Sequence, residues 1–328
     1  MPVMLGQSNI FGQMRAQLHC YARCDVQVLI EGETGTGKEL AAREIHYASE
    51  RSEQPFVPVN CGALPDTLIE NELFGHERGA YTDARSAQPG LIDHARGGTL
   101  FLDEVDSLSI KAQVTLLRFL ENNEYRPVGC GVARVSSARI VAATNANLET
   151  QVAAGLFRRD LQYRLNALHV RLPPLRERGG DVPMLAEHFL RQVAQRLGRP
   201  AKRWTDGALR VLDAHDWPGN VRELENVVLR AYLGTDGAVI DAFILDGLIA
   251  SAPNISSNSP AKMLQDETEL RYVSAKHNAM CAFERSYLFG LMTKTAGNIT
   301  AAARLSGTDR RQLGKLLKKH HIETGVFR

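Results

Sequence analysis

Short apolar runs alternate with longer amphipathic segments over residues 1–171. Four runs have the length and apolar content of buried strands, and each ends in a polar residue: VQVLIE from Val26, FVPVN ending at Asn60, GTLFLDE ending at Glu104, and ARIVAATN ending at Asn145. KELAAREIHYAS and IKAQVTLLRFLEN between them repeat apolar residues at helical spacing. This alternation predicts a parallel sheet covered by helices, with its ligand site at the carboxyl ends of the strands.

The pattern becomes helical after LPPLRERGGDVP, which begins at Leu172. We therefore predict an α/β subdomain over residues 1–171 and a small helical subdomain over residues 172–247. Within the second, WPGNVRELENVVLRAYL places Asn220 as a helix N-cap with Glu223 three residues later. That spacing is typical of a capping box.

The segment SAPNISSNSPAK, residues 251–262, is rich in Ser, Pro and Asn and predicts a flexible linker over residues 248–265. Residues 266–328 are helical in pattern. AGNITAAARLSGTDRRQLGKLLKKHHI predicts a helix, a tight turn at Gly307 and a second helix, with Ala301 and Ala302 allowing close packing.

Composition changes this picture little. The chain has 328 residues, 44% hydrophobic and 23% charged, with a net charge of +2. Five cysteines with no CxxC pair predict reduced thiols in a cytoplasmic protein, most of them packed in the core. No apolar run reaches membrane-spanning length, and the N-terminus lacks the pattern of a signal peptide.

The segment GETGTGKE follows the first predicted strand and opens a helix. Glycines let backbone N–H groups surround phosphates, and Lys38 would reach the terminal phosphates. The general phosphate-loop pattern has Ser or Thr where Glu39 stands. A glycine turn with a surface lysine is the alternative. The predicted nucleotide contacts are Gly32, Glu33, Thr34, Gly35, Thr36, Gly37, Lys38 and Glu39.

Two carboxylates end the strand GGTLFLDE. We predict that Asp103 holds Mg²⁺ through its water shell and that Glu104 orients the attacking water. A solvated acidic strand end is the alternative. Two adjacent carboxylates after a phosphate loop favour ATP hydrolysis over that alternative.

Three arginines lie in FRRDLQYRL: Arg158, Arg159 and Arg164. Phosphoryl transfer is accelerated by a guanidinium that reaches the γ-phosphate, often from a neighbouring subunit. Spacing alone favours the alternative, a solvated helix face.

Together these segments resemble the AAA+ domain of the bacterial sigma-54-dependent transcription activators. The resemblance runs from about Gly6 to Asp246 and rests on GETGTGKE, ELFGHERGAYTDA, GGTLFLDE, FRRDLQYRL, LPPLRER and WPGNVREL, in that order. It implies a P-loop NTPase with a helical lid, ATP and Mg²⁺ as ligands, and a ring of subunits, usually a hexamer. In this family Glu occupies the position of Glu39.

The resemblance also implies roles for single residues. Asn60 would pair with the catalytic glutamate and couple nucleotide state to the loops. Asn145 would be sensor I and Arg222 sensor II. Arg158 and Arg164 would be arginine fingers acting on the neighbouring subunit, while Arg159 stays on the surface.

The segment GAYTDA is similar to the family's GAFTGA loop, which contacts sigma-54: Gly79, Ala80, Tyr81, Thr82, Asp83 and Ala84. Tyr81 would be the contact aromatic, and a Tyr81 side chain folded into the core is the alternative. Tyr81 stands where the family has Phe, which adds a hydroxyl. Asp83 replaces the second Gly and adds a charge to the contact surface; Asp tolerates left-handed backbone better than most residues.

The C-terminal region resembles the Fis-type helix-turn-helix domain of the same activators. Seven Lys and Arg lie between Arg304 and Arg328, against Asp309 and Glu323. We expect the start of the recognition helix to reach base edges in double-stranded DNA and its later lysines to contact phosphates. The predicted DNA-binding residues are Arg310, Arg311, Gln312, Lys315, Lys318 and Lys319.

These features predict an ATP-driven, DNA-bound activator of sigma-54 RNA polymerase. A nucleotide-binding DNA regulator that does not engage sigma-54 is the alternative, because GAYTDA departs from GAFTGA. An AAA+ remodeller such as a helicase loader or chaperone is a third, which the loop and the helix-turn-helix disfavour. The AAA+ region begins almost at Met1. We therefore expect no receiver or ligand-sensing domain ahead of it, and control by a separate regulatory protein or by expression level.

Overall fold

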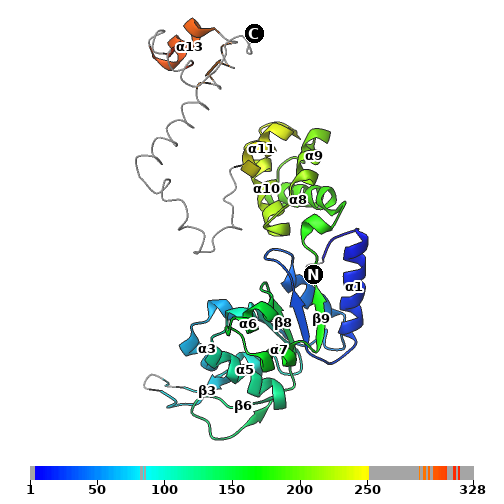
Figure 1. Ribbon diagram of the computed structural model, residues 1–328, viewed down its shortest axis with the longest axis vertical. Coiled ribbons are helices and arrows are strands. Elements are labelled where there is room, and N and C mark those ends of the chain that lie inside the picture. The colour runs from blue at the N-terminus through cyan, green and yellow to red at the C-terminus, as the bar shows by residue number, and fades with distance from the viewer. Residues whose placement is uncertain are drawn as a thin grey trace. The chain divides into compact units, whose positions relative to one another are not determined.

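The computed structural model describes residues 4–81, 84, 86–250, 288, 291–292, 295, 298–308, 313–314 and 317. The chain divides into two compact units, Met1–Ser256 and Ser257–Arg328. The first unit holds the α/β subdomain and the helical subdomain (Figure 1). No helix within the described residues is long and apolar enough to cross a membrane.

A five-stranded parallel sheet forms the centre of the α/β subdomain, in the order β2-β5-β8-β1-β9. Its strands are β1 (Val28–Glu31), β2 (Phe56–Asn60), β5 (Thr99–Asp103), β8 (Arg139–Thr144) and β9 (Leu168–Arg171). Because all pairs are parallel, the strands end at one edge, and Asn60 lies opposite Asp103 there. The predicted fold class is confirmed.

Alternate residues of these strands enter two separate cores, as the two-residue period of a strand requires. Val28, Ile30 and Phe101 pack against α1 (Asn9–Ala22) and α2 (Lys38–Tyr47). Leu29, Leu100 and Leu102 pack on the other face against the remaining helices of the subdomain. These are α3 (Asp66–Phe74), α4 (Leu91–His94), α5 (Ile110–Asn122), α6 (Leu148–Ala153) and α7 (Arg159–Leu165), with the 3₁₀ turns η1 (Cys61–Ala63) and η2 (Val105–Ser107).

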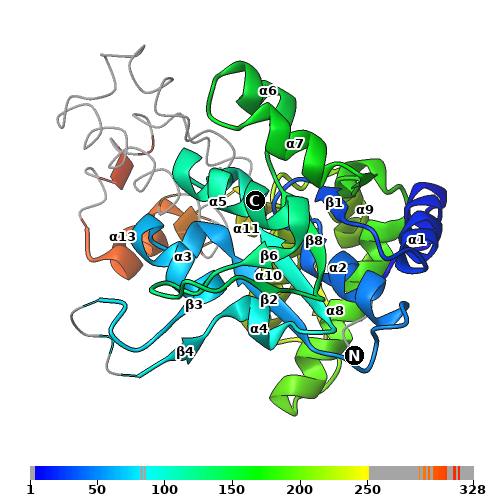
Figure 2. The ribbon, with the colours of Figure 1, turned by 90° about the horizontal axis from the view of Figure 1, so that it is seen from below.

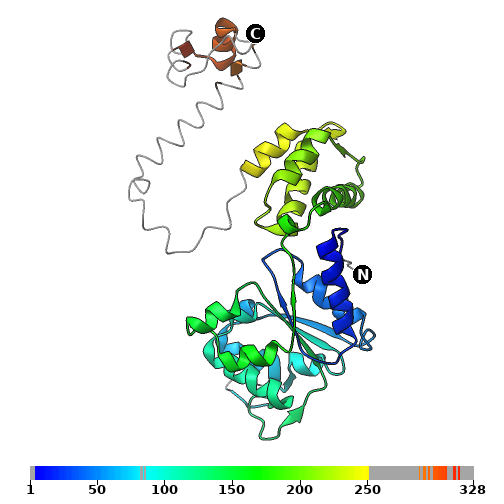
Figure 3. The same cartoon turned by 45° about the vertical axis from the view of Figure 1, so that its right-hand side comes forward.

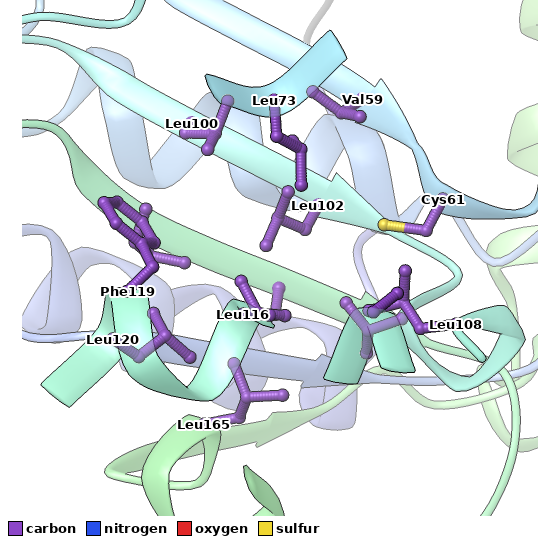
Figure 4. Packing of buried hydrophobic residues seen from close by; sticks show 14 of the residues in the cluster. Val59, Cys61, Leu73, Leu100, Leu102, Leu108, Leu116, Phe119, Leu120 and Leu165 are labelled. Atoms are coloured by element: carbon purple, nitrogen blue, oxygen red, sulfur yellow. The ribbon is translucent and has the colours of Figure 1, made fainter. Parts of the chain in front are cut away.

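The second core shows how one helix is fixed by its ends and its apolar face. The Ser109 hydroxyl accepts a hydrogen bond from the Ala112 N–H at 3.3 Å and so caps the start of α5. Asn123 ends the helix in the left-handed conformation. Between them, Leu116, Phe119 and Leu120 point toward Leu100 and Leu102 of β5 (Figure 4).

The helical subdomain, here called the lid, consists of η3 (Leu175–Glu177), α8 (Asp181–Leu197), α9 (Asp206–Ala214), α10 (Asn220–Gly234) and α11 (Ala242–Ala250), with the short strands β10 (Arg203–Trp204) and β11 (Val239–Ile240). Its helices form their own group beyond the sheet (Figure 3). They enclose a third core around the fully buried Trp217. Helix α11 extends to Ala250, past the predicted end of the lid at residue 247.

The predicted capping box at Asn220 is wrong in detail. Gly219 is the N-cap of α10, and its N–H donates to Glu223 Oε2 at 2.8 Å. Asn220 is the first helical residue and has a left-handed φ of 53°. Its side chain is turned toward the phosphate loop instead.

Two short hairpins leave the body of the α/β subdomain: β3 (Gly75–His76) with β4 (Gln88–Pro89), and β6 (Glu124–Tyr125) with β7 (Arg134–Val135). Figure 2 shows β3 and β4 leading out to the projecting segment that contains Tyr81. Among the described cysteines only Cys61 is buried, so the expectation of core packing for most thiols is wrong: Cys20 and Cys24 are exposed and Cys130 is half-buried.

The second unit is described in part. Helix α13 (Ile299–Ser306) begins at Asn298, whose side chain caps it, and ends at Gly307 with a left-handed φ of 67°. This agrees with the predicted turn. Ala302 and Ala303 are buried with Leu288, Met292 and Leu313. Ala301 is exposed, so its predicted packing role belongs to Ala303.

Candidate nucleotide site

The phosphate loop connects strand β1, which lies between β8 and β9 in the sheet, to α2. Gly35 and Gly37 have left-handed φ values of 80° and 97°, which glycine adopts without strain. Lys38 folds back over the loop, and its Nζ donates to the carbonyl oxygens of Gly32 at 2.8 Å and Glu33 at 3.2 Å. Thr36 closes the turn by donating to the same Glu33 oxygen at 2.7 Å. The loop is therefore already curled around the start of α2.

Lys38 is only 8% exposed. Burial lowers the pKa of Lys38, and the carboxylates of Asp103 and Glu104 partly oppose this shift. Burial raises the pKa of Asp103, and the Lys38 ammonium group opposes it. The two opposite charges thus share a poorly hydrated site, where interactions with phosphate and metal charges are stronger than in water.

A cavity of about 700 Å³ opens beside the loop. Its volume is within the range of small-molecule and cofactor sites. Nine predicted site residues line it: Thr34, Gly35, Thr36, Gly37, Lys38, Glu39, Asp103, Glu104 and Arg222. The structure therefore brings the loop, the strand-end carboxylates and the sensor II arginine into one space.

Glu104 directly follows β5 and has a left-handed φ of 55°. This conformation is uncommon outside glycine and is typical of constrained functional positions. The Glu104 carboxylate extends over Gly62, because a Cβ on Gly62 would lie 2.6 Å from Glu104 Oε2. It would also lie 3.3 Å from Asn60 Oδ1. Gly62 thus leaves the space in which the Glu104 and Asn60 side chains approach each other.

Asn60 and Asn145 lie beside the cavity and not in its wall. Asn60 Oδ1 accepts from the Ala63 N–H at 3.1 Å and caps η1. Asn145 follows β8, and its amide lies 3.4 Å from the Thr34 hydroxyl of the phosphate loop. Both amides lie at the strand-end edge beside the cavity, as predicted, but neither lines it.

The described residues could hold Mg²⁺ only together with phosphates and water. They contain no group of three or more His, Cys, Asp or Glu side chains that could hold a metal ion alone. Mg²⁺ is commonly bound by one or two carboxylates together with phosphates and water. The desolvated Asp103 carboxylate is suited to that role. Glu39 instead pairs with Arg43 one turn along α2, at 2.8 Å.

The two predicted arginine fingers are held differently. Arg158 precedes α7 and forms a bidentate pair with Asp160 at 3.0 and 2.7 Å, with its guanidinium group near solvent. The Arg164 guanidinium donates to the Leu120 carbonyl oxygen at 2.9 and 2.6 Å, which caps the end of α5. Arg159 is exposed, as expected.

The segment around Tyr81 is supported at its base. The Gly79 N–H donates to the Ala84 carbonyl oxygen at 2.9 Å, which closes the loop. The β6–β7 connection supports it from the side, since the Arg134 guanidinium pairs with Glu77 at 2.7 Å. The Tyr81 ring lies 5.1 Å from the His76 ring and is 46% exposed. It therefore rests on the surface of the subdomain and is not folded into the core.

Several predicted residues lie outside the described part of the chain. In the loop these are Thr82 and Asp83. In the C-terminal unit they are all the predicted DNA-binding residues: Arg310, Arg311, Gln312, Lys315, Lys318 and Lys319.

Sequence reasoning missed the N-terminal and lid walls of the cavity. Met4 and Leu5 line it, as do His188 and Phe189 of α8. The Arg178 guanidinium holds the N-terminal segment by donating to the Leu5 carbonyl oxygen at 2.6 Å. The sequence predicted a helical subdomain over residues 172–247 but gave no sign of which of its residues would face a nucleotide.

Family models match almost the whole chain in three consecutive parts. The sigma-54 interaction domain matches residues 4–171. The AAA+ ATPase lid domain matches residues 176–262, and the Fis family of bacterial regulatory proteins matches residues 281–320.

The chain belongs to the sigma-54-dependent transcription activators.

Named relatives of this activator are similar along its length. The transcriptional regulatory protein GlrR of Escherichia coli K12 is 40% identical over 323 residues, covering 98% of this chain and 69% of GlrR. The Nif-specific regulatory protein of Azotobacter vinelandii is 43% identical, covering 98% of this chain and 59% of that protein. The response regulator PilR of Pseudomonas aeruginosa is 42% identical, covering 98% and 70%.

Solved structures agree with this assignment. The crystal structure of NtrX from Brucella abortus in complex with ATP is 32% identical and has a TM-score of 0.70, covering 98% of this activator and 69% of that chain. The predictions of an AAA+ P-loop fold, a lid and a Fis-type region are confirmed. The third interpretation, a helicase loader or chaperone, does not agree with the matched domains.

Proposed function

We propose that this activator hydrolyses ATP in the cavity beside the phosphate loop and uses the reaction to remodel the closed complex of sigma-54 RNA polymerase. The single observation that supports this best is the convergence of Lys38, Asp103, Glu104 and Arg222 on one cavity of about 700 Å³. Membership of the AAA+ ATPases supports nucleotide binding in general, and the NtrX complex contains ATP in a related chain.

The roles follow from chemistry. Lys38, together with the loop N–H groups and the start of α2, would bind the β- and γ-phosphates. Mg²⁺ would be held by Asp103 and water, and would neutralise phosphate charge. Glu104 would orient and polarise the attacking water, and Asn60 beside it would control the position of the Glu104 carboxylate.

A second subunit would complete the site. Arg158 lies outside the cavity of its own chain, and among the described residues its guanidinium group pairs with Asp160 alone, near solvent. A short movement would release it toward the nucleotide of a neighbour, so we propose it as the principal arginine finger. Arg164, which caps α5, would hold the finger segment in place. A finger acting between subunits requires a ring, and a hexamer is usual in the family.

The segment with Tyr81 would transmit the reaction to sigma-54. A half-exposed aromatic ring offers contact area with few rotatable bonds, which favours binding to a partner. The Fis-type region would bind upstream DNA, and a separate regulatory protein would control the activator in trans.

Promoter opening by the purified chain tests this function. With ATP, wild-type protein should form open complexes at a sigma-54 promoter. Glu104→Gln should bind ATP with unchanged affinity but hydrolyse it about a hundredfold more slowly and open no promoter. Glu149→Gln, on an exposed part of α6, is the matched control and should act like wild type. Loss of ATP binding in Glu104→Gln would contradict the role given to Glu104. A wild-type chain that hydrolyses ATP and binds DNA but opens no promoter would favour a regulator that does not engage sigma-54.

A further inference from the structure

The outer side of the phosphate loop is bound to the lid at three consecutive residues. The Glu33 carboxylate accepts two hydrogen bonds from the Arg176 guanidinium, at 2.6 and 2.9 Å. The Thr34 carbonyl oxygen accepts from Asn220 Nδ2 at 3.1 Å, and the Gly35 carbonyl oxygen accepts from the Val221 N–H at 3.0 Å. The lid therefore contacts the loop directly, at residues 33, 34 and 35.

Asn220 occupies the centre of this contact. Besides Thr34, its Nδ2 donates to Glu33 Oε2 at 3.1 Å, while its Oδ1 accepts from the Leu175 N–H at 2.8 Å. One fully buried amide thus connects the loop, the η3 turn and the start of α10. Buried polar groups that are fully bonded fix geometry strongly, because an unpaired one is costly.

Two backbone features support the same contact. Asn220 is held at a left-handed φ of 53°, a conformation that asparagine tolerates better than most residues. Opposite it, a side chain on Gly35 would collide with the carbonyl oxygen of Gly219. The close approach of loop and lid therefore requires a glycine at position 35 and constrains the backbone at Asn220.

Arg222 follows Asn220 by two residues on the same turn of α10 and lines the cavity. Because Asn220 fixes that turn against the loop, it also fixes where the Arg222 side chain starts. We infer that Asn220 is a positioning residue, which aligns the lid and Arg222 with the bound nucleotide by bonding to Glu33 and Thr34. The inference rests on the proposed nucleotide site.

The charge on Glu33 is part of the contact. The Arg176 hydrogen bonds lower the pKa of Glu33; burial opposes this shift and Asn220 adds to it. The carboxylate consequently stays ionised and acts as a constant acceptor for the lid. The glutamate at this loop position thus faces the lid, which explains its presence in a phosphate-binding segment.

A donor–acceptor exchange tests the inference through nucleotide affinity. Asn220→Asp keeps the acceptor for Leu175 and tolerates the left-handed backbone, but it places a carboxylate against Glu33. Binding of a non-hydrolysable ATP analogue should weaken about tenfold. Adding Glu33→Gln supplies an amide donor to the carboxylate that Asn220→Asp introduces, and the double variant should recover at least about threefold of that loss. Asn298→Asp, at the N-cap of α13 in the other compact unit, is the matched control and should bind like wild type.

A second cycle separates positioning from simple folding. Asn220→Gly removes the side chain without backbone strain, and its effect on analogue affinity should nearly vanish in an Arg222→Ala background. If Asn220→Asp disrupts folding, Arg176→Gln replaces it in the test, because Arg176 is half-exposed and the variant should fold normally. Its loss of analogue affinity should be smaller. Additive effects in both cycles, or wild-type affinity in Asn220→Asp and Arg176→Gln, would overturn the inference. These outcomes are read against wild-type binding, so they are distinct from a failure of the wild-type chain to bind nucleotide at all.

Discussion

The nucleotide cavity and the segment that carries Tyr81 belong to one compact unit of the chain but are held in different ways. Lys38 and Asn220 are buried and bonded to several groups each. Tyr81 is half-exposed and rests on one ring, that of His76. Under the proposed function, this difference would correspond to a division of work: the fixed groups would perform the chemistry, and the loosely held aromatic would bind the partner. Changes in the cavity should therefore stop ATP hydrolysis, whereas changes in the segment that carries Tyr81 should leave hydrolysis intact and stop only promoter opening.

The largest effect should come from Arg158→Ala. Removing the proposed arginine finger takes away charge stabilisation in the transition state, so steady-state ATPase activity of the assembled protein should fall by about a thousandfold. Its melting temperature should not change, because the Arg158 guanidinium group pairs with Asp160 near the surface, where ion pairs contribute little to stability. Arg159→Ala, one residue along and exposed, is the control and should keep full activity.

Tyr81→Ala should separate promoter opening from ATP hydrolysis most clearly. Promoter opening should fall by more than about tenfold, since the contact aromatic is lost. ATPase activity should stay within about twofold of wild type, because Tyr81 does not line the cavity. Tyr81→Phe keeps the ring that the family uses and should open promoters normally. A parallel fall of both activities in Tyr81→Ala would show that loop and cavity are not separable.

Arg164→Ala should have the smallest but broadest effect. The variant leaves the Leu120 carbonyl oxygen at the end of α5 without its charged donors. We expect a loss of about 1–2 kcal/mol in the free energy of unfolding, measured by chemical denaturation, together with reduced ATPase activity. Unchanged stability with an ATPase loss as large as that of Arg158→Ala would instead make Arg164 an equal finger.

Much of the fold and of the nucleotide cavity could be predicted from local sequence. The alternation of apolar runs placed the strand ends at one edge, and GETGTGKE with GGTLFLDE located the charged groups of the cavity. These patterns are local because a strand, a turn and a helix start are each specified by adjacent residues.

The remaining features depend on contacts between distant segments. Asn220 had the spacing of a capping box, yet the lid's approach to Gly35 turned its side chain to the loop. Leu5 lines the cavity, and its backbone carbonyl is held by Arg178, which is far along the chain. Likewise, the bond from Arg164 to Leu120 follows from the packing of α7 on α5. Spacing along the sequence contains no information about such pairs.

Mixing two inactive variants tests most directly whether ATP is hydrolysed between subunits. Glu104→Gln retains Arg158, and Arg158→Ala retains Glu104, so each can supply what the other lacks across a shared interface. Equal amounts, mixed and allowed to assemble at random, should recover about a quarter of wild-type ATPase activity if the sites act independently. Activity no higher than that of the separate variants would contradict a site shared by neighbouring subunits.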